Sequence, residues 1–321
     1  MPSNHCALVG VVLLLDGCAG PSTDEVPAAA ALSEDDVAAA FQGAWELASV
    51  VRYSGEGEEL SRDESSTGFI MYDPAGTVGV VIQGADRGTD AGDEATPEEI
   101  LAAYRSYASY FGAYTVDPET KTVTHHLRAG LNPGVAGSDL VRQYEFDEDR
   151  LTLQPPAGGG DGGVVRLIWR RLPDLADLTD EHRRFIGFWE FSRLDRTDAS
   201  GAALPAPRTY GDGLIIYTAS GHMAVHLARP DRELFAQRRP TAEEAGAAMS
   251  TYVSYFGPYT IQPDEETVVH HRSGCWVPGC IGSDARRGYE FGDGTLTLKP
   301  PAREVDGRSV QDALTWRRIS E

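Results

Sequence analysis

The chain has 321 residues, enough for two domains of ordinary size that each bury a core. Its 49 acidic residues outnumber its 28 basic ones, so the formal net charge is −21 and the surface potential repels phosphate backbones and anionic lipid. This composition argues against nucleic-acid binding. It indicates either a well-solvated surface or a field that steers a cationic partner.

Small and apolar residues dominate the first 18 positions, where an apolar run over 7–15 is too short to span a bilayer as a helix and is followed by Cys18. This arrangement resembles a bacterial lipoprotein signal, in which Cys18 becomes the lipidated first residue. We therefore expect a signal over 1–18 and a tether over 19–31. The protein is then extracytoplasmic, periplasmic or at the cell surface, and it meets a membrane only through a lipid anchor at Cys18.

The rest of the chain repeats itself once, at an offset of 144 to 147 residues. Matching segments share both sequence and order; they are 43–45 and 187–189, 68–72 and 213–217, 107–112 and 252–257, 125–126 and 270–271, and 144–146 and 289–291. The constant offset leaves room for few insertions. We expect two copies of one domain, over 32–172 and 178–320, joined by a linker over 173–177.

Each copy begins with a short helical signal, at 32–36 and 178–181, where Ser33 or Thr179 can cap the first turn. Alternating or β-branched runs then follow in the first copy, near 44–53, 67–73, 77–83, 113–117, 121–128, 140–146, 150–155 and 164–172. Tight turn signals separate several of them. A meander of eight short strands predicts an all-β fold, two tandem eight-stranded antiparallel barrels.

One inserted helix interrupts the strands of each copy. Thr96 and Glu99 form a capping-box pattern, and the helix is expected from Pro97 to Phe111, ending at Gly112. Thr241 repeats the box before a helix that ends at Gly257. In the first copy an apolar stripe would pack on the barrel; it consists of Ile100, Tyr104, Tyr107 and Phe111, and its counterpart is Ala245, Met249, Tyr252 and Phe256.

Three motifs recur in both copies: Tyr-x-x-Tyr-Phe-Gly-x-Tyr-Thr, a Val/Thr-His-His strand, and Tyr-Glu-Phe followed by Leu-Thr-Leu. On these residues the chain resembles the bacterial and fungal lipocalin-like domain family, over nearly all of 40–319. The resemblance implies barrels that hold a small apolar ligand. The second copy keeps a further family-like stretch at 223–232, which the first replaces with an acidic one at 84–90, so we expect the two barrels to differ in ligand choice.

A Gly-x-Trp at the start of each first strand resembles the wider lipocalin pattern, in which the Trp closes one barrel end beneath an Arg from the last strand. Carried over by position, Trp45 would pair with Arg170 or Arg171. Trp189 would pair with Arg317 or Arg318. These are interpreted as fold residues, not catalysts.

Strand alternation places Arg142, Tyr144 and Phe146 on one face, and likewise Arg287, Tyr289 and Phe291. If that face points inward, each barrel holds a cation among aromatic rings. A buried Arg needs either a protein acid or an anionic ligand group. Both possibilities stay open here.

Adjacent histidines on a strand face opposite ways, so one of each pair can enter the barrel, and flanking apolar residues favour His125 and His270. They could be structural, contact a ligand, act as acid or base, or ligate haem. Four tyrosines could present hydroxyls to a ligand or hold the helix to the barrel; they are Tyr107, Tyr110, Tyr252 and Tyr255.

Cys275 and Cys280 are the cysteines left once the signal is excluded, and an even pair in an oxidising compartment predicts a disulfide. Two free thiols in a reduced protein are the alternative. No metal or cofactor is expected, since only His270 and His271 lie nearby as further ligands.

The leading hypothesis is therefore an exported protein that encloses small hydrophobic molecules with one polar or anionic end. An isomerase or cyclase acting on a lipid or polyketide is the alternative, with His125 or His270 as acid/base and the arginine holding an oxyanion. A haem-binding barrel is the third. We find no phosphate loop, nucleophile elbow or zinc-protease motif, and the oligomeric state stays open.

Overall fold

The computed structural model describes residues 34–85, 87, 95–156, 163–206 and 209–319. The expected signal, tether, lipidation at Cys18 and cap at Ser33 lie outside the described residues. Among the helices that are described, none has the length and apolar character needed to cross a membrane.

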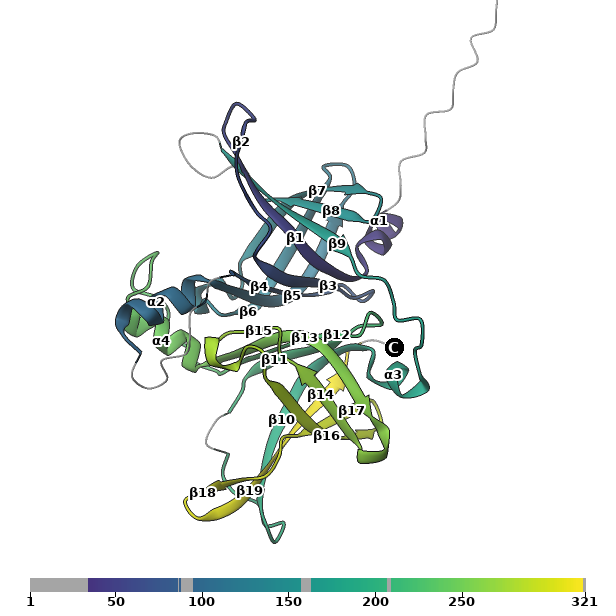
Figure 1. The fold of residues 1–321 in the computed structure, drawn as a ribbon, viewed down its shortest axis with the longest axis vertical. Helices are drawn as coiled ribbons and strands as arrows, with labels where there is room; N and C mark the ends of the chain where they lie inside the picture. The colour runs from purple at the N-terminus through teal and green to yellow at the C-terminus, as the bar shows by residue number, and fades with distance from the viewer. Residues whose placement is uncertain (1–33, 86, 88–94, 157–162, 207–208, 320–321) are drawn as a thin grey trace, which may run out of the picture. The chain divides into compact units, whose positions relative to one another are not determined.

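The first half of the chain forms a closed antiparallel barrel, barrel 1 (Figure 1). Its strands are β1 (Gly43–Tyr53), β2 (Glu59–Asp63), β3 (Thr67–Tyr72), β4 (Thr77–Gln83), β5 (Tyr107–Asp117), β6 (Thr122–Gly130), β7 (Asp139–Asp147), β8 (Arg150–Gln154) and β9 (Val164–Arg171). Neighbours in sequence pair along the sheet, and β1 pairs with β9 to close it. β2 pairs with β1 outside this ring, which leaves the eight strands that the alternation predicts.

The second half forms barrel 2 in the same way. Its strands are β10 (Gly187–Asp198), β11 (Asp212–Tyr217), β12 (His222–Ala228), β13 (Tyr252–Gln262), β14 (Thr267–His271), β15 (Gly274–Cys275), β16 (Asp284–Gly292), β17 (Thr295–Lys299), β18 (Arg303–Val305) and β19 (Arg308–Arg318). β10 pairs with β19 to close the ring, while β15 and β18 are short additions to β13 and β19. The prediction of two tandem eight-stranded barrels is confirmed.

A short helix fills one end of each barrel. α1 (Glu34–Phe41) and α3 (Asp180–Phe185) each end on a fully buried phenylalanine, Phe41 and Phe185. Phe41 makes edge-on ring contacts with Tyr72, Tyr144 and Phe146, and Phe185 makes the equivalent contacts in barrel 2. These helices therefore close the barrels with an aromatic plug.

The inserted helices begin as predicted but end earlier. α2 (Pro97–Arg105) and α4 (Ala242–Ser250) both start with a complete capping box. The prediction that α2 reaches Phe111 is wrong: residues 107–112 form the start of β5, as 252–257 start β13. Tyr and Phe favour a pleated surface, and pairing with β4 on one side and β6 on the other satisfies the backbone of this segment. The predicted helical stripe is therefore split between a helix and a strand.

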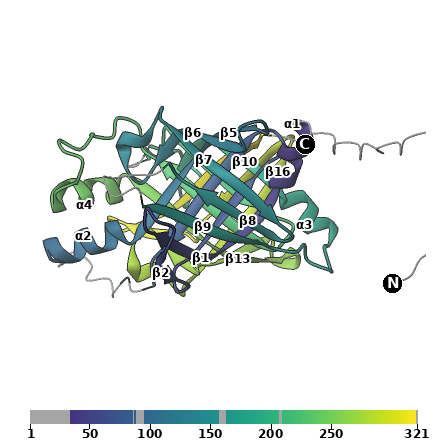
Figure 2. The ribbon, with the colours of Figure 1, turned by 90° about the horizontal axis from the view of Figure 1, so that it is seen from above.

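The outer faces of the two barrels share a buried cluster within the compact unit formed by residues 33–321. In Figure 1, β3–β6 of barrel 1 face β11–β13 of barrel 2, and both views place α2 beside α4 (Figure 2). The buried side chains come from both halves; they include Phe69, Met71, Tyr107, Phe111, Leu214, Ile216, Tyr252 and Phe256. Strands β4 and β12 are therefore largely buried on both faces.

Polar groups inside this interface bond to one another across it. Ser109 Oγ lies 2.8 Å from Ser254 Oγ and 3.0 Å from His226 Nδ1. The Tyr107 hydroxyl meets Ser254 Oγ at 3.1 Å, and the Tyr252 hydroxyl meets Ser109 Oγ at 3.1 Å. The reciprocal pairs give the contact an approximate two-fold character, as expected when two copies of one surface meet.

Cys275 and Cys280 form a disulfide, with Cα atoms 6.0 Å apart, so the predicted pairing is confirmed. The bond closes the loop that carries Trp276. The Cys275 amide donates to Gln83 Oε1 of barrel 1 at 3.0 Å. The Arg87 guanidinium of barrel 1 donates to the Trp276 carbonyl at 2.7 Å. The disulfide therefore shapes a loop that contacts the other barrel.

Candidate functional site

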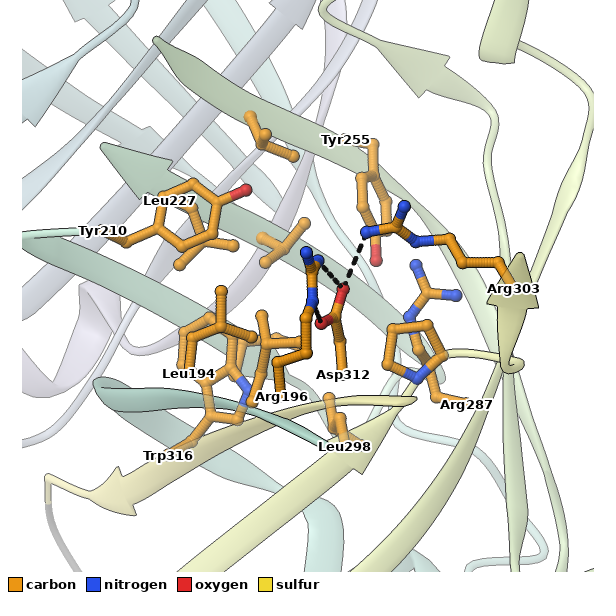
Figure 3. Close-up of a pocket in the computed structure, with 15 residues that line it drawn as sticks. Leu194, Arg196, Tyr210, Leu227, Tyr255, Arg287, Leu298, Arg303, Asp312 and Trp316 are labelled. Atoms are coloured by element: carbon orange, nitrogen blue, oxygen red, sulfur yellow. Dashed lines mark hydrogen bonds and ion pairs between the residues drawn. The ribbon is translucent and has the colours of Figure 1, made fainter. Parts of the chain in front are cut away.

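Barrel 2 contains a cavity of about 590 Å³ (Figure 3). Most of its lining residues are aliphatic or aromatic and come from the inward positions of successive strands; they include Leu194, Tyr210, Ile215, Val225, Leu227, Leu298, Leu314 and Trp316. In Figure 3, Arg287 and Arg303 lie on one side and Leu194, Tyr210 and Trp316 on the other. The cavity is thus amphipathic, with an apolar body and a cationic side.

An ion-pair cluster forms part of the polar lining. Arg196 on β10 donates two hydrogen bonds to Asp312 on β19, at 2.6 and 2.8 Å, and Arg303 on β18 adds a third at 3.1 Å. The Arg196 and Asp312 side chains are only 7% and 16% exposed. These hydrogen bonds lower the pKa of Asp312, which outweighs the opposing effect of burial. Asp312 is thus an ionised carboxylate whose two oxygens are already occupied.

Arg287 on β16 is a different kind of cation. Its side chain lines the cavity, and its Nη1 donates to the carbonyl of Arg286 at 2.8 Å. Among the described residues, no carboxylate lies within ion-pair distance of it. Its charge also contributes to lowering the pKa of His270. The sequence left two possible partners for this arginine, a protein acid or an anionic ligand group. In the described part of the chain, no protein acid pairs with it.

A buried histidine joins two tyrosines beside the cavity. His270 on β14 lies between two tyrosine hydroxyls: Tyr217 Oη of β11 is 2.7 Å from Nε2, and Tyr255 Oη of β13 is 2.9 Å from Nδ1. Burial, and then the charge of Arg287, hold the pKa of His270 well below its usual value, so the ring is neutral. Tyr255 lines the cavity (Figure 3), whereas His270 is not among the lining residues.

Barrel 1 repeats this arrangement in its own interior. His125 lies between the Tyr72 hydroxyl at Nε2, 2.9 Å, and the Tyr110 hydroxyl at Nδ1, 3.0 Å. Burial lowers the pKa of His125 to about 3, and the nearby charge of Arg142 acts in the same direction. Arg142 donates to the Val141 carbonyl at 2.9 Å, as Arg287 does to Arg286. The inward positions expected for His125 and His270 are where the structure places them.

The other histidine of each pair faces outward. His126 lies 2.8 Å from Asp139, and His271 lies 2.8 Å from Asp284. Within the described residues, no group of three His, Cys, Asp or Glu side chains has the arrangement of a metal site.

The Trp–Arg pairs lie at the helix-plugged ends of the barrels. The Arg171 guanidinium is 4.0 Å from the Trp45 ring centroid, and that of Arg318 is 4.0 Å from the Trp189 ring centroid. Each indole N–H donates to the last carbonyl of the plug helix, Phe41 or Phe185, at 2.7 and 2.8 Å. These residues join first strand, last strand and helix, which is a structural role.

Four other predicted ligand residues lie away from the cavity of barrel 2. Tyr144 and Tyr289 contact the plug residues Phe41 and Phe185. Tyr107 and Tyr252 are buried in the contact between the barrels, bonded to serines there. The tyrosine that faces the cavity is three residues later, Tyr255, because a strand, unlike a helix, turns residues three apart to opposite faces.

The model of the lipocalin-like domain matches residues 42–172 and again 186–319. The chain belongs to the lipocalin-like domain family. Both matched regions coincide with a closed barrel, so the family assignment and the fold agree. The search of curated proteins found no match to this lipocalin-like protein.

Several solved structures have a low sequence identity to the tandem lipocalin-like chain. A protein of unknown function from Nostoc punctiforme is 12% identical, with 90% of this chain and 100% of that one covered and a TM-score of 0.22. A candidate outer membrane protein from Bacteroides fragilis is 11% identical, with 88% and 99% covered and a TM-score of 0.20. The di-domain aromatase/cyclase StfQ from the steffimycin biosynthetic pathway is 10% identical, with 88% and 76% covered and a TM-score of 0.15.

Sequence reasoning missed Arg196, Arg303 and Asp312. Arg196 and Asp312 lie far apart in the chain and become opposite partners only through the pairing of β10 with β19. A weak signal existed: Asp312 interrupts a series of alternating apolar residues on the last strand, Val310, Leu314 and Trp316, and a lone acid in such a series requires a cation.

Proposed function

We propose that barrel 2 binds a small, mostly apolar molecule that carries one anionic end. The observation that carries this proposal is the cavity of about 590 Å³ with apolar walls and, in Arg287, a cation without an acid partner among the described residues. This volume lies in the range typical of small-molecule sites. Apolar walls supply affinity, and the few polar groups orient the ligand.

The charges of the lining support an anion in preference to a neutral polar group. Asp312 neutralises one of the three lining arginines, which leaves two positive charges in excess. A partly desolvated guanidinium is stabilised by a carboxylate or similar oxyanion, which it can bind through two parallel hydrogen bonds. The proposed orientation places the anion at Arg287 and the apolar body against Trp316 and Leu314.

The main test uses a fluorescent probe and a matched pair of variants. Anilinonaphthalene sulfonate combines aromatic rings with an anion, and we expect it to bind and to be displaced by decanoate. Arg287→Met should weaken binding about tenfold, the loss of one charge-assisted hydrogen bond. Arg286→Met is the control, because Arg286 is the neighbouring residue but faces outward and pairs with Glu265. Equal affinity of the two variants would contradict the proposal.

A second test needs no assumption about the ligand. Organic extraction or native mass spectrometry of freshly purified protein should recover an apolar acid from the wild type and less of it from Arg287→Met. Repeated gentle preparations that yield no bound compound would count against a carrier role.

We further propose that the protein acts outside the cytoplasm, anchored through a lipid on Cys18. The disulfide between Cys275 and Cys280 supports an oxidising compartment. Fractionation and the mass of the mature protein test this, since the Cys18→Ser variant should lose the lipid mass and leave the membrane fraction.

The two alternative functions gain less support. A haem ligand needs a free imidazole nitrogen, but both ring nitrogens of His125 and His270 are bonded to tyrosine hydroxyls. For an isomerase or cyclase, the group in reach of a substrate in barrel 2 would be Tyr255 and not His270, because Tyr255 lines the cavity and His270 does not.

A further inference from the structure

His270 decides which way the hydroxyl of Tyr255 points its proton. A neutral imidazole has one nitrogen that donates and one that accepts, so the ring exists in two tautomers that orient its two tyrosine partners differently. In one, Nδ1 donates to the Tyr255 oxygen. In the other, Nδ1 accepts the hydrogen bond from the Tyr255 O–H, so the Tyr255 proton is not available to a ligand.

The surroundings of Tyr217 select between these tautomers. Its side chain is 1% exposed, and the His270 ring is its one hydrogen-bond partner among the described residues. The Tyr217 proton therefore has an acceptor only if Nε2 carries the lone pair. In the other tautomer a buried O–H would have none, at a cost that proteins avoid.

The consequence reaches the cavity. With the lone pair on Nε2, the proton sits on Nδ1 and is donated to the Tyr255 oxygen, 2.9 Å away. The Tyr255 hydroxyl then has its own proton left over, and it faces the cavity lining (Figure 3).

Two further polar groups of the cavity lining are also donors. Arg287 offers its guanidinium, and the Trp316 indole N–H is buried without a hydrogen-bond partner in the described residues. The one carboxylate of the lining, Asp312, is occupied by Arg196 and Arg303. A ligand group placed here meets donors and needs acceptor oxygens.

We propose that His270 is a positioning residue, held in its Nδ1–H tautomer by Tyr217, that makes Tyr255 a hydrogen-bond donor and so selects a deprotonated acid over the matching alcohol. This deepens the proposed function and rests on it. The same chain of groups in barrel 1, Tyr72 to His125 to Tyr110, has the same nitrogens in the same order. Barrel 1 therefore repeats the same tyrosine–histidine–tyrosine arrangement.

The tautomer is tested without any ligand. Two-bond nitrogen–proton NMR spectra of the full chain distinguish a protonated from an unprotonated ring nitrogen, and the His270 signals are assigned by their loss in His270→Gln. We expect protonated Nδ1 and unprotonated Nε2. A protonated Nε2 would overturn the proposal.

Selectivity is tested with decanoate and decanol as competitors of anilinonaphthalene sulfonate. Tyr255→Phe should weaken decanoate about tenfold, as expected for a lost hydrogen bond to a charged group, and change decanol about twofold or less. Tyr259→Phe is the control, because Tyr259 is a buried tyrosine of the same strand whose hydroxyl donates to the Thr218 carbonyl. Decanoate affinity unchanged by Tyr255→Phe would overturn the proposal.

The two proposals fail in different ways. If the wild type binds neither the probe nor decanoate, the proposed function fails and the selectivity falls with it, whatever the tautomer. If the wild type binds decanoate through Arg287 but Tyr255→Phe has no effect, the proposed function stands and this inference is wrong.

Discussion

The two barrels differ most clearly at one paired position near the open end. In barrel 2 the β10–β19 register sets Arg196 opposite Asp312, and both side chains are largely buried. In barrel 1 the equivalent β1–β9 register sets Arg52 opposite Val165, and Arg52 is exposed. The same fold thus buries an arginine where an acid stands opposite and turns it to solvent where none does. The acid, not the backbone, gives barrel 2 this part of its polar lining.

The outer faces differ as well, although they meet each other. The β12 position of His226 in barrel 2 corresponds to Val81 on β4 of barrel 1. Burial lowers the pKa of His226 to about 3, and its Nε2 has no hydrogen-bond partner among the described residues. One copy of the duplicated surface therefore carries a titratable group that the other lacks.

Removing the acid should produce the largest effect. Asp312→Ala leaves Arg196 buried without a partner, and we expect it to lower the free energy of unfolding of barrel 2 by about 3–5 kcal/mol. Urea denaturation followed by tryptophan fluorescence measures this. Arg52→Met in barrel 1 is the comparison, expected to change stability by about 0.5 kcal/mol or less because Arg52 is exposed. Similar losses in both variants would contradict the distinction between the barrels.

Acid should destabilise the chain through its buried histidines. The pKa values of His125, His226 and His270 are lowered on folding, to about 3 for the first two, from an ordinary value of 6.5. These groups take up a proton on unfolding, so their stabilising effect is complete above 6.5 and is lost as pH falls below it. Near pH 6 each should cost about 1 kcal/mol.

A substitution taken from barrel 1 isolates the contribution of one of these three histidines to the pH dependence of stability. His226→Val places the barrel 1 residue in barrel 2, and it should reduce the difference in stability between pH 7.5 and pH 5.5 by about a third of the histidine contribution. Urea midpoints at the two pH values measure it. An unchanged difference would mean that His226 does not titrate as a buried neutral base.

Two equivalent arginines hold the barrels together unequally. Arg232 of barrel 2 donates to the carbonyls of Gly130 and Leu131 in barrel 1, at 2.5 and 2.6 Å. Arg87 of barrel 1 donates to one carbonyl in barrel 2, that of Trp276. We expect Arg232→Met to lower stability by about 1 kcal/mol more than Arg87→Met, because each arginine makes two hydrogen bonds within its own barrel and only the bonds between the barrels differ in number. Urea denaturation tests the order, and the reverse order would refute this reading.

The last comparison concerns the loops that receive these arginines. Barrel 2 closes its loop with the Cys275–Cys280 disulfide, while the barrel 1 loop has Gly130 and Val135 at the equivalent places. The double variant Cys275→Ser, Cys280→Ser should lose about 2 kcal/mol or less, since the closed loop is short. Thermal unfolding with and without reductant measures it, and reductant should not affect the double variant.

Local patterns in the sequence were sufficient for the duplication, the barrels and the inward histidines. Strand alternation, with a period of two, places His125 and Arg142 on the inner face without knowledge of any partner. Helical periodicity misassigned residues 107–112, because Tyr107 and Phe111 fit a helical stripe as well as the outer face of a strand. Only the second barrel, which buries that outer face, explains why it is apolar.

What the sequence by itself determined is therefore the set of faces: which residues point in, which point out, and how often the pattern repeats. The tertiary structure decided which groups meet. The Arg196–Asp312 pair depends on closing the first strand onto the last, and the Tyr217–His270–Tyr255 chain depends on bringing β11, β13 and β14 together. Ion pairs and hydrogen bonds act over a few ångströms, so residues distant in the chain acquire these partners only when the barrel closes.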